Sequence, residues 1–179
     1  MPRLFVAIDL PAPVKERLTE LCYGLPGAKW MPPEQLHLTL RFIGEVDGGL
    51  YREIRSALAE IATPPFTMGL KGLGCFPPRK QPRVLWVGIH PIAEPLLRLR
   101  NRLESTLVRL GLEPEHRKFA PHITLARLRE TPLPRLANFL AGNGLFAAAP
   151  FPVKEFHLYS SVLSPKGAIH TVEESYPLT

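Results

Sequence analysis

The sequence predicts an α+β fold with largely antiparallel β-sheets, arranged as two lobes. Segments with the alternating or continuous apolar pattern of strands are interleaved with segments of helical period. Several strand-like segments follow one another as hairpin-like pairs, which favours antiparallel pairing. One strand tetrad also occurs twice, about half the chain length apart, which predicts two related lobes around a shared cleft.

The elements of the first half follow from the spacing of apolar residues. Short apolar runs predict strands, and apolar residues at steps of three and four predict helices. Asp47 is placed to cap the second helix, and Pro64-Pro65 ends it. The predicted elements are a strand at 3–9, a helix at 11–25, a strand at 37–43, a helix at 50–61, and two strands at 66–76 and 83–89 joined by a basic, proline-rich loop.

The third helix has the clearest pattern, because its leucines recur at steps of three and four up to Gly111, a suitable C-cap. A weaker helical pattern follows the second tetrad, and a Ser-Pro-Lys-Gly turn separates two final strands. The predicted elements are a helix at 92–110, a strand at 121–128, a helix at 133–140, and strands at 153–163 and 168–175.

Length and composition are those of a globular protein. The 179 residues, 45% apolar and 21% charged, can form a sizeable core, so we expect a single domain over 1–179. The net charge of +6 favours an anionic partner such as nucleic acid or a phosphorylated ligand, although a small protein can be basic without one. Cys22 and Cys75 form no zinc or disulfide pattern, and no segment has the length of a signal peptide or a membrane span. We therefore expect a cytoplasmic setting, and we expect a monomer.

Two near-identical tetrads, HLTL at 37–40 and HITL at 122–125, carry the functional signal. Side chains alternate across a strand, so the histidine and threonine of each tetrad share one face, and the leucines and isoleucine occupy the other. We expect the apolar face to be buried and the imidazole and hydroxyl to face the cleft. Arg41 would continue the face of its histidine, whereas strict alternation turns Arg127 away from the second histidine unless a bulge intervenes.

Two imidazoles and two hydroxyls are the groups that metal-free phosphodiester chemistry needs. A neutral histidine takes a proton from the attacking oxygen, and a protonated histidine gives one to the leaving oxygen; the ordinary pKa of imidazole suits both tasks. The candidate acid–base pair is His37 and His122, and the spacing does not say which is the acid. Thr39 and Thr124 would donate hydrogen bonds to the non-bridging phosphate oxygens.

Two other interpretations of the tetrads stay open. A lone His-x-Thr pattern in a strand is usually structural, although its near-identical repetition favours function. The remaining histidines, His90, His116, His157 and His170, show no metal-ligand spacing, and no acid cluster accompanies either tetrad. The sequence therefore predicts no metal and no cofactor, but a metal site assembled only in three dimensions stays an alternative.

The tetrads and several other stretches resemble the 2H phosphoesterase superfamily, in particular its RNA 2′,3′-cyclic phosphodiesterase (2′–5′ RNA ligase-like) branch. They occur in family order over nearly the whole chain. Towards the C-terminus His170 and Tyr176 stand where the family has Tyr and Phe, and we interpret them as peripheral, substrate-edge positions. The matching stretches are 3–11, WMPPEQLHLTLRFIGEV at 30–46, 72–77, 82–86, 119–127 and 158–161.

The resemblance implies a bilobal fold with a β-sheet in each lobe, helices outside and an active-site cleft between the lobes. It implies metal-independent hydrolysis of an RNA 2′,3′-cyclic phosphate end, for example on tRNA-like fragments, to a 2′-phosphate. In the family the first histidine is taken as the proton donor and the second as the proton acceptor, which would be His37 and His122. The reverse reaction, which joins a cyclic-phosphate end to a 5′-hydroxyl through a 2′–5′ linkage, is the family's ligase activity.

Further side chains are candidates for substrate binding. Arg127 and Arg41 could contact the phosphate, and Tyr159 and Phe5 could stack on a base, although Phe5 in an apolar strand also fits a core position. The charges that could steer RNA, each of which also fits a solvated surface position, are Arg79, Lys80, Arg83, Arg117 and Lys118.

Three functions are compatible with the sequence. The first is a hydrolase of RNA 2′,3′-cyclic phosphate ends. The second uses the same chemistry on small cyclic nucleotides or mainly in the ligase direction. The third is a non-catalytic RNA-binding module. The presence of both histidines and both threonines argues against the third, because binding alone needs charge and aromatic surface and not a matched acid–base pair.

Overall fold

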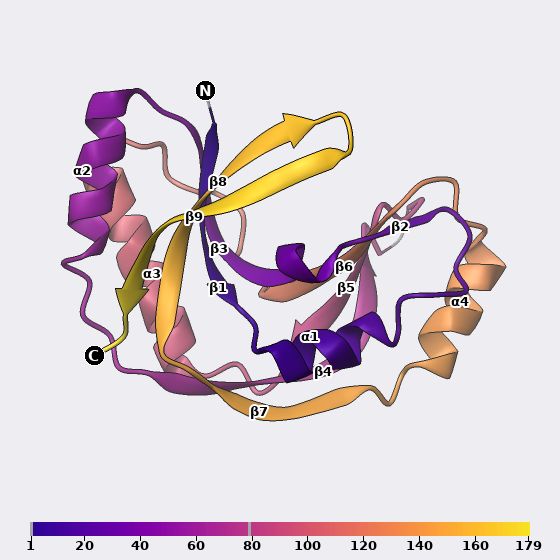
Figure 1. The fold of residues 1–179 in the computed structure, drawn as a ribbon. Coiled ribbons are helices and arrows are strands. Elements are labelled where there is room, and N and C mark those ends of the chain that lie inside the picture. Colours follow the sequence, from indigo (N-terminus) through magenta and orange to yellow (C-terminus); the bar gives the residue numbers. More distant parts are fainter. Residues whose placement is uncertain (1, 79) are drawn as a thin grey trace.

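The computed structural model describes residues 2–78 and 80–179, so Arg79, one of the candidate RNA-steering charges, lies outside the described residues. The α+β class is confirmed: within the described residues nine strands form one curled antiparallel sheet, and four α-helices pack around it (Figure 1). The strands are β1 Arg3–Asp9, β2 Ala28–Trp30, β3 His37–Glu45, β4 Phe66–Phe76, β5 Val84–Ile89, β6 His122–Leu128, β7 Ala147–Val153, β8 Glu155–Ser164 and β9 Gly167–Pro177. The helices are α1 Ala12–Thr19, α2 Gly48–Leu58, α3 Glu94–Arg109 and α4 Leu133–Gly142, with a 3₁₀ turn, η1, at Pro33–Gln35.

The two tetrad strands lie next to each other in the middle of the sheet. The strand order is β7-β4-β5-β6-β3-β1-β8-β9, and β2 pairs with β6 beside this path. Each tetrad strand, β3 or β6, is therefore the innermost strand of a four-stranded half. The sequence predicts one sheet per lobe, but the pairing of Leu38 in β3 with Ile123 in β6 joins the halves into a continuous sheet. This pairing satisfies backbone groups that would otherwise lie on two exposed sheet edges.

One hydrophobic core fills the side of the sheet on which the helices lie, which we call the core face. The leucines at positions 96, 99, 103 and 107 of α3 are all buried there, as the helical spacing predicts. Figure 1 shows α2 and α3 packed together at one end of the molecule and α4 at the other. Leu38 and Ile123 belong to the same buried cluster. The opposite side of the sheet carries the histidines and threonines of the tetrads, and we call it the motif face.

Most predicted boundaries agree with the structure within a few residues. Asp47 caps α2 as predicted, because its side chain accepts a hydrogen bond from the backbone N–H of Leu50 at 2.8 Å. The first helix is the exception, since it ends at Thr19 and not near residue 25. Gly24 and Gly27 take positive φ values of 79° and 78° there, and the chain turns to bring β2 beside β6.

Two strands have no counterpart in the sequence-based prediction. β7 contains Pro150 and Pro152 and lies at the edge of the sheet, where a residue without an N–H group is tolerated. β2 has only three residues and pairs with the distal part of β6. Neither segment shows enough alternation of apolar and polar residues to predict a strand.

Candidate active site

β3 and β6 bring the two tetrads together on the motif face. The antiparallel register that pairs Leu38 with Ile123 places His37 beside Thr124 and Thr39 beside His122. The leucine and isoleucine side chains of both tetrads point into the core and are at most 3% exposed. The four polar side chains are half-buried on the opposite face. Two imidazoles and two hydroxyls therefore alternate around the pair formed by Leu38 and Ile123.

A β-bulge lies at the last residue of each tetrad. In β3 the register with β1 shifts so that Leu40 is the extra residue, and in β6 the register with β5 shifts so that Leu125 is the extra residue. Each bulge reverses the alternation of side chains beyond it. Arg127 consequently returns to the motif face, where it is exposed opposite Val84 of β5. The bulge that Arg127 needs in order to share a face with His122 is therefore present.

The first bulge overturns the prediction for Arg41. The extra residue turns its side chain to the core face, where Arg41 is only 8% exposed and its Nε donates a hydrogen bond to Glu104 of α3 at 2.8 Å. Arg41 therefore does not share the face of His37. Phe42 occupies the corresponding place on the motif face, paired across the strands with Phe5.

Rings from three other strands surround His37. Its ring centroid lies 5.1 Å from that of Phe5 in β1, 6.0 Å from that of Tyr159 in β8 and 5.5 Å from that of His170 in β9. Its Nε2 is 3.0 Å from Oγ1 of Thr39. Phe5 and Tyr159 also stack on each other at 5.1 Å and are 4% and 6% exposed. Their rings pack on each other and beside the ring of His37, and for Phe5 this is the core position that the sequence also allows. Stacking of Tyr159 on a base stays a prediction.

The surroundings of His37 favour its neutral form. Burial, together with the charge of a protonated His170, lowers the pKa of His37 from 6.5 to about 4. The backbone of Gln35 and the carboxylate of Asp9 act in the opposite direction, and Lys15, which pairs with Asp9 at 2.9 Å, adds to the lowering. His37 is therefore neutral at pH 7 in the free protein.

His122 is held through its other ring nitrogen. Its Nδ1 lies 2.7 Å from the carbonyl oxygen of Ala120, and because a carbonyl can only accept, Nδ1 carries the hydrogen. The ring packs edge-on against Phe76 at 5.0 Å and near Trp86 at 6.3 Å. The indole of Trp86 lies so close to Gly74 that a Cβ atom there would collide with it. The Nε2 atom of His122 is left as the lone-pair nitrogen of the neutral ring.

The aromatic neighbours of His122 were not singled out by the sequence. Phe76 and Trp86 lie on β4 and β5, and Trp86 pairs across the strands with Thr124 on the motif face. His170, predicted as a peripheral position, lies directly beside His37. The signal that could have found these residues is their place in predicted strands, but only the register shows which face each one occupies.

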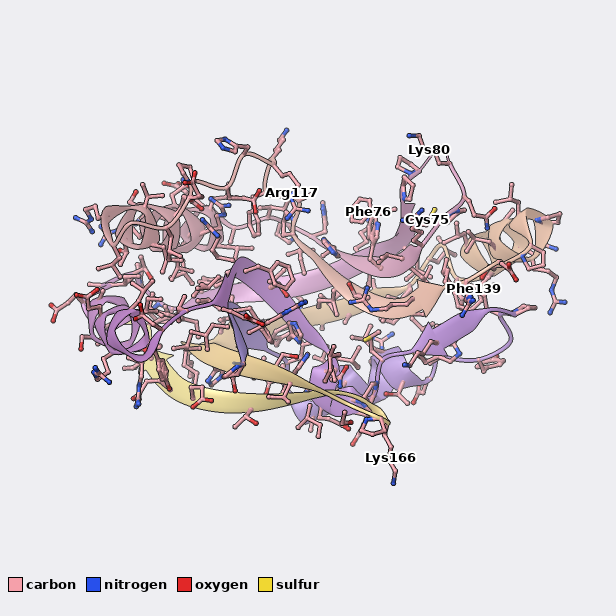
Figure 2. The ribbon with its side chains drawn as sticks, turned by 90° about the horizontal axis from the view of Figure 1, so that it is seen from above. Cys75, Phe76, Lys80, Arg117, Phe139 and Lys166 are labelled. Atoms are coloured by element: carbon pink, nitrogen blue, oxygen red, sulfur yellow. The ribbon has the colours of Figure 1, made fainter. Side chains whose placement is uncertain are left out.

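The described candidate RNA-steering charges are on the surface. Lys80 and Arg117 project from the same side of the molecule as Phe76, whereas Lys166 at the β8–β9 turn projects from the opposite side (Figure 2). Arg117 also donates from Nε to Glu115 at 3.2 Å. The other exposed members of the set are Arg83 and Lys118.

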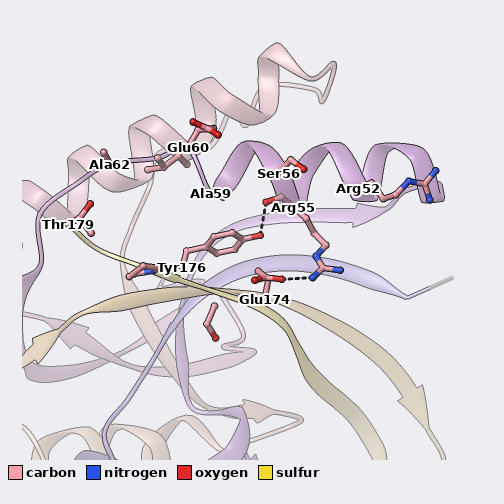
Figure 3. Close-up of a pocket in the computed structure, with 12 residues that line it drawn as sticks. Arg52, Arg55, Ser56, Ala59, Glu60, Ala62, Glu174, Tyr176 and Thr179 are labelled. Carbon is pink, nitrogen blue, oxygen red and sulfur yellow. Dashed lines mark hydrogen bonds and ion pairs between the residues drawn. The ribbon is translucent and has the colours of Figure 1, made fainter.

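A cavity of about 670 Å³ lies away from the tetrads, between α2 and β9 (Figure 3). Tyr176 lines it, is 4% exposed, stacks on Phe156 and donates its hydroxyl hydrogen bond to the carbonyl oxygen of Arg55 at 3.1 Å. The interpretation of Tyr176 as a substrate-edge residue is therefore wrong, because it packs on the core face. No tetrad residue lines this cavity.

In residues 2–78 and 80–179, no helix is both long and apolar enough to cross a membrane. No group of three His, Cys, Asp or Glu side chains in those ranges is arranged so that it could hold a metal ion.

Comparison with known protein families agrees with this geometry. The family described as LigT-like phosphoesterase matches residues 8–86 and again residues 87–170, with one tetrad in each match. The chain belongs to the LigT-like phosphoesterase family. The resemblance to 2H phosphoesterases is thereby confirmed, and phosphoester chemistry is the general function of this family member.

Relatives of this LigT-like phosphoesterase match over nearly its whole length. A protein of Archaeoglobus fulgidus named RNA 2′,3′-cyclic phosphodiesterase is 35% identical over 172 residues, which cover 94% of this chain and 96% of the relative. The crystal structure of TT0787 of Thermus thermophilus aligns with a TM-score of 0.83 at 34% identity, covering 98% of this chain and 97% of that one. The crystal structure of E. coli LigT complexed with 3′-AMP aligns with a TM-score of 0.82 at 30% identity, covering 100% and 99%.

Proposed function

We propose that this phosphoesterase hydrolyses the 2′,3′-cyclic phosphate at the end of an RNA to a 2′-phosphate without a metal ion. The observation that carries the proposal is the alternation of His37, Thr124, Thr39 and His122 on one face of the sheet. The A. fulgidus relative bears the name of this activity, and E. coli LigT was crystallised with 3′-AMP. The net charge of +6 suits a polyanionic substrate.

His122 is suited to accept the proton of the attacking water. The hydrogen bond from Nδ1 to Ala120 fixes the ring so that the lone pair of Nε2 is free in the neutral form. Nε2 takes a proton as the water oxygen attacks phosphorus, and the ring becomes an imidazolium ion. Phe76 and Trp86 restrict the tilt of the ring, which preserves the direction of the lone pair.

His37 is suited to donate a proton once the substrate is bound. In the free protein its low pKa keeps it neutral, but a phosphate anion in contact with the ring favours the protonated form and raises that pKa. Protonated His37 then gives its proton to the 3′ oxygen as the bond between phosphorus and that oxygen breaks. The products are a 2′-phosphate and a 3′-hydroxyl.

The remaining polar groups of the motif face hold the phosphate between the two rings. The hydroxyls of Thr39 and Thr124 donate hydrogen bonds to the non-bridging oxygens, where negative charge is concentrated in the transition state. Arg127, which the second bulge returns to this face, adds a positive charge at its margin.

A short RNA that ends in a 2′,3′-cyclic phosphate, incubated with the protein in excess EDTA, tests the proposal. We expect a 2′-phosphate product, and turnover about 10²- to 10⁴-fold slower for His37→Ala and for His122→Ala. Undiminished turnover in both variants would contradict the two-histidine assignment. Complete loss of turnover in EDTA would contradict the metal-independent mechanism.

Parallel reactions separate the related activities. Faster hydrolysis of 2′,3′-cyclic AMP than of the RNA would identify a cyclic-nucleotide phosphodiesterase. Formation of a longer strand when an RNA with a 5′-hydroxyl is added would identify a ligase. Binding of the RNA without any turnover would identify a non-catalytic module.

A further inference from the structure

Arg41 connects the first tetrad strand with the segment that precedes the second tetrad. On the core face its guanidinium donates from Nε to Glu104 of α3 at 2.8 Å and from a terminal nitrogen to the carbonyl oxygen of Glu113 at 2.5 Å. Glu104 also accepts from the backbone N–H of Glu115 at 3.0 Å and lies 3.3 Å from Arg100. We call these three residues, Arg41, Glu104 and Arg100, the anchor cluster. The anchor cluster holds the start of the loop between α3 and β6.

Side chains hold this loop, residues 113–121, in place. Among the described residues, no backbone–backbone hydrogen bond involves the loop. Pro114 and Pro121 have no N–H group to donate. Further along the loop, the guanidinium carbon of Arg100 lies over the ring of Phe119, 5.5 Å from its centroid. The anchor cluster therefore contacts both the beginning and the end of the loop.

The loop ends at the carbonyl group that orients the second histidine. The carbonyl oxygen of Ala120 accepts from Nδ1 of His122 at 2.7 Å, one residue after the ring that Arg100 covers. We propose that the anchor cluster positions His122. Through this cluster, Arg41 on the first tetrad strand fixes the orientation of the imidazole ring on the second. This inference rests on the proposed function, in which Nε2 of His122 accepts the proton.

Burial makes the anchor cluster sensitive to the loss of one member. Arg41 and Arg100 are 8% and 9% exposed, and both pair with the carboxylate of Glu104. Burial acts to raise the pKa of Glu104, but hydrogen bonds from Arg41 and from the N–H of Glu115 outweigh it, so the pKa is lowered overall. Removal of this carboxylate would leave two buried guanidinium groups without their counter-charge.

Glu104→Gln and Arg41→Lys test the proposal, with Glu174→Gln as the matched control. Glu174 forms an ion pair with Arg55 on the surface beside the α2–β9 cavity (Figure 3), and no tetrad residue lines that cavity. Both test variants remove part of the buried hydrogen-bond network, whereas the control removes an equivalent charge from an exposed pair.

The measurements are the tautomer of His122 by ¹⁵N NMR, hydrogen exchange of the backbone N–H group of Glu115, which donates to Glu104, and kcat and KM. In the test variants we expect a mixture of His122 tautomers and faster exchange in the loop. We also expect kcat to fall about 10- to 100-fold with KM nearly unchanged, because the proton acceptor is displaced and phosphate binding is not. The control is expected to match the wild type in all three.

Folded test variants that keep the wild-type tautomer and loop exchange would overturn the proposal. If Glu104→Gln and Arg41→Lys do not fold, Phe119→Leu, which removes only the ring beneath Arg100, decides by the same two readouts. Neither readout needs a substrate. If the wild type does not hydrolyse cyclic phosphate RNA, the proposed function fails, while a changed His122 tautomer still supports the positioning role of the cluster.

Discussion

His37 and His122 occupy different electrostatic environments on the motif face. His37 is packed among rings, and burial and His170 disfavour its positive charge. His122 donates from Nδ1 to a carbonyl group, which leaves its ring free to become positively charged at Nε2. In the proposed mechanism, the first histidine therefore acquires its proton together with the phosphate, and the second accepts a proton at Nε2.

The charge of His170 is expected to influence the titration of His37. In His170→Phe the pKa of His37 should rise above its wild-type value of about 4, because one of the charges that lowers it is gone. It should stay below 6.5, because burial, the larger cause, remains. NMR titration of the His37 ring measures the shift, and His116→Asn in the exposed part of the 113–121 loop is the control. An unchanged or lower pKa in His170→Phe would contradict the prediction.

The lowered pKa of His37 makes the free energy of unfolding depend on pH. The pKa of His37 is lower in the folded state than its ordinary value, so the unfolded chain binds more protons between pH 6.5 and about 4. The free energy of unfolding therefore decreases as the pH falls through this range, and the stabilisation is fully present above it. Urea unfolding should show a smaller decrease in His170→Phe, because its folded-state pKa lies closer to 6.5.

Arg127 is expected to contribute to substrate binding or turnover through its charge. Arg127→Gln should lower kcat/KM on cyclic phosphate RNA about 10- to 100-fold, the size of a lost hydrogen bond to a charged group. Arg129→Gln, which removes an exposed arginine just beyond the end of β6, should leave kcat/KM near the wild-type value. Equal losses in the two variants would indicate general attraction of RNA and not a contact with the phosphate.

At the scale of residues, the sequence predicts the tetrads and misses their surroundings. His37, Thr39, His122 and Thr124 could be found because a tetrad is local and its faces follow from strand alternation. Arg41 was assigned to the wrong face because alternation alone does not reveal a bulge. The rings around each histidine come from strands distant in the sequence, so only the register of the sheet brings them together.

At the scale of elements, the contact between β4 and β5 shapes the side of the motif face beside His122. The indole of Trp86 in β5 lies across Gly74 in β4, and these two residues pair directly across the strands. The absence of a side chain at residue 74 lets the indole lie flat on the sheet. The rings of Trp86 and Phe76 then form the aromatic surroundings of His122.

Gly74→Ala should disturb this contact. The new methyl group would collide with the ring of Trp86, so we expect a loss of about 1–3 kcal/mol in the free energy of unfolding and a shift in tryptophan fluorescence. Gly142→Ala is the matched control, because no atom lies within 4 Å of its added methyl group at the end of α4. A Gly74→Ala variant as stable as this control would show that the indole does not need to lie against residue 74.

Element prediction succeeded where apolar patterns are long and failed where they are short. The leucines of α3 and the cap of α2 gave helices in the right places. β7 could not be predicted, because Pro150 and Pro152 are compatible with a strand only at the edge of a sheet, and the edge is a property of the whole fold. β2 has only three residues and pairs with β6, which is distant in the sequence.

At the scale of the molecule, one core unites two halves that meet at a single backbone pair. Leu38 and Ile123 form that pair directly between the histidines and threonines, and both side chains are fully buried. The helices of both halves pack into the same hydrophobic cluster. The geometry of the candidate active site is therefore linked to the stability of the whole fold. The two-lobed arrangement was predictable from the repeated tetrad, but the joint between the lobes was not.

Leu38→Ala tests this link. Loss of the buried side chain should lower the free energy of unfolding by about 2–5 kcal/mol. Because the core is shared, circular dichroism and tryptophan fluorescence should report one common urea transition. Leu145→Ala, at a fully exposed leucine, should change stability by less than about 0.5 kcal/mol. Separate transitions for the two probes would show that the halves unfold independently.

The strand order also bears on how such a chain could arise. β4, which follows the first tetrad, pairs with β5 in the half of the second, and β8, which follows the second tetrad, pairs with β1 in the half of the first. A half-length ancestor with one tetrad would lack partners for these strands unless a second copy supplied them. Gene duplication and fusion of such a strand-swapped homodimer would produce this topology. Fusion would also allow the two copies to diverge in sequence. The equivalent positions after the two bulges hold different residues, a buried arginine, Arg41, and an alanine, Ala126.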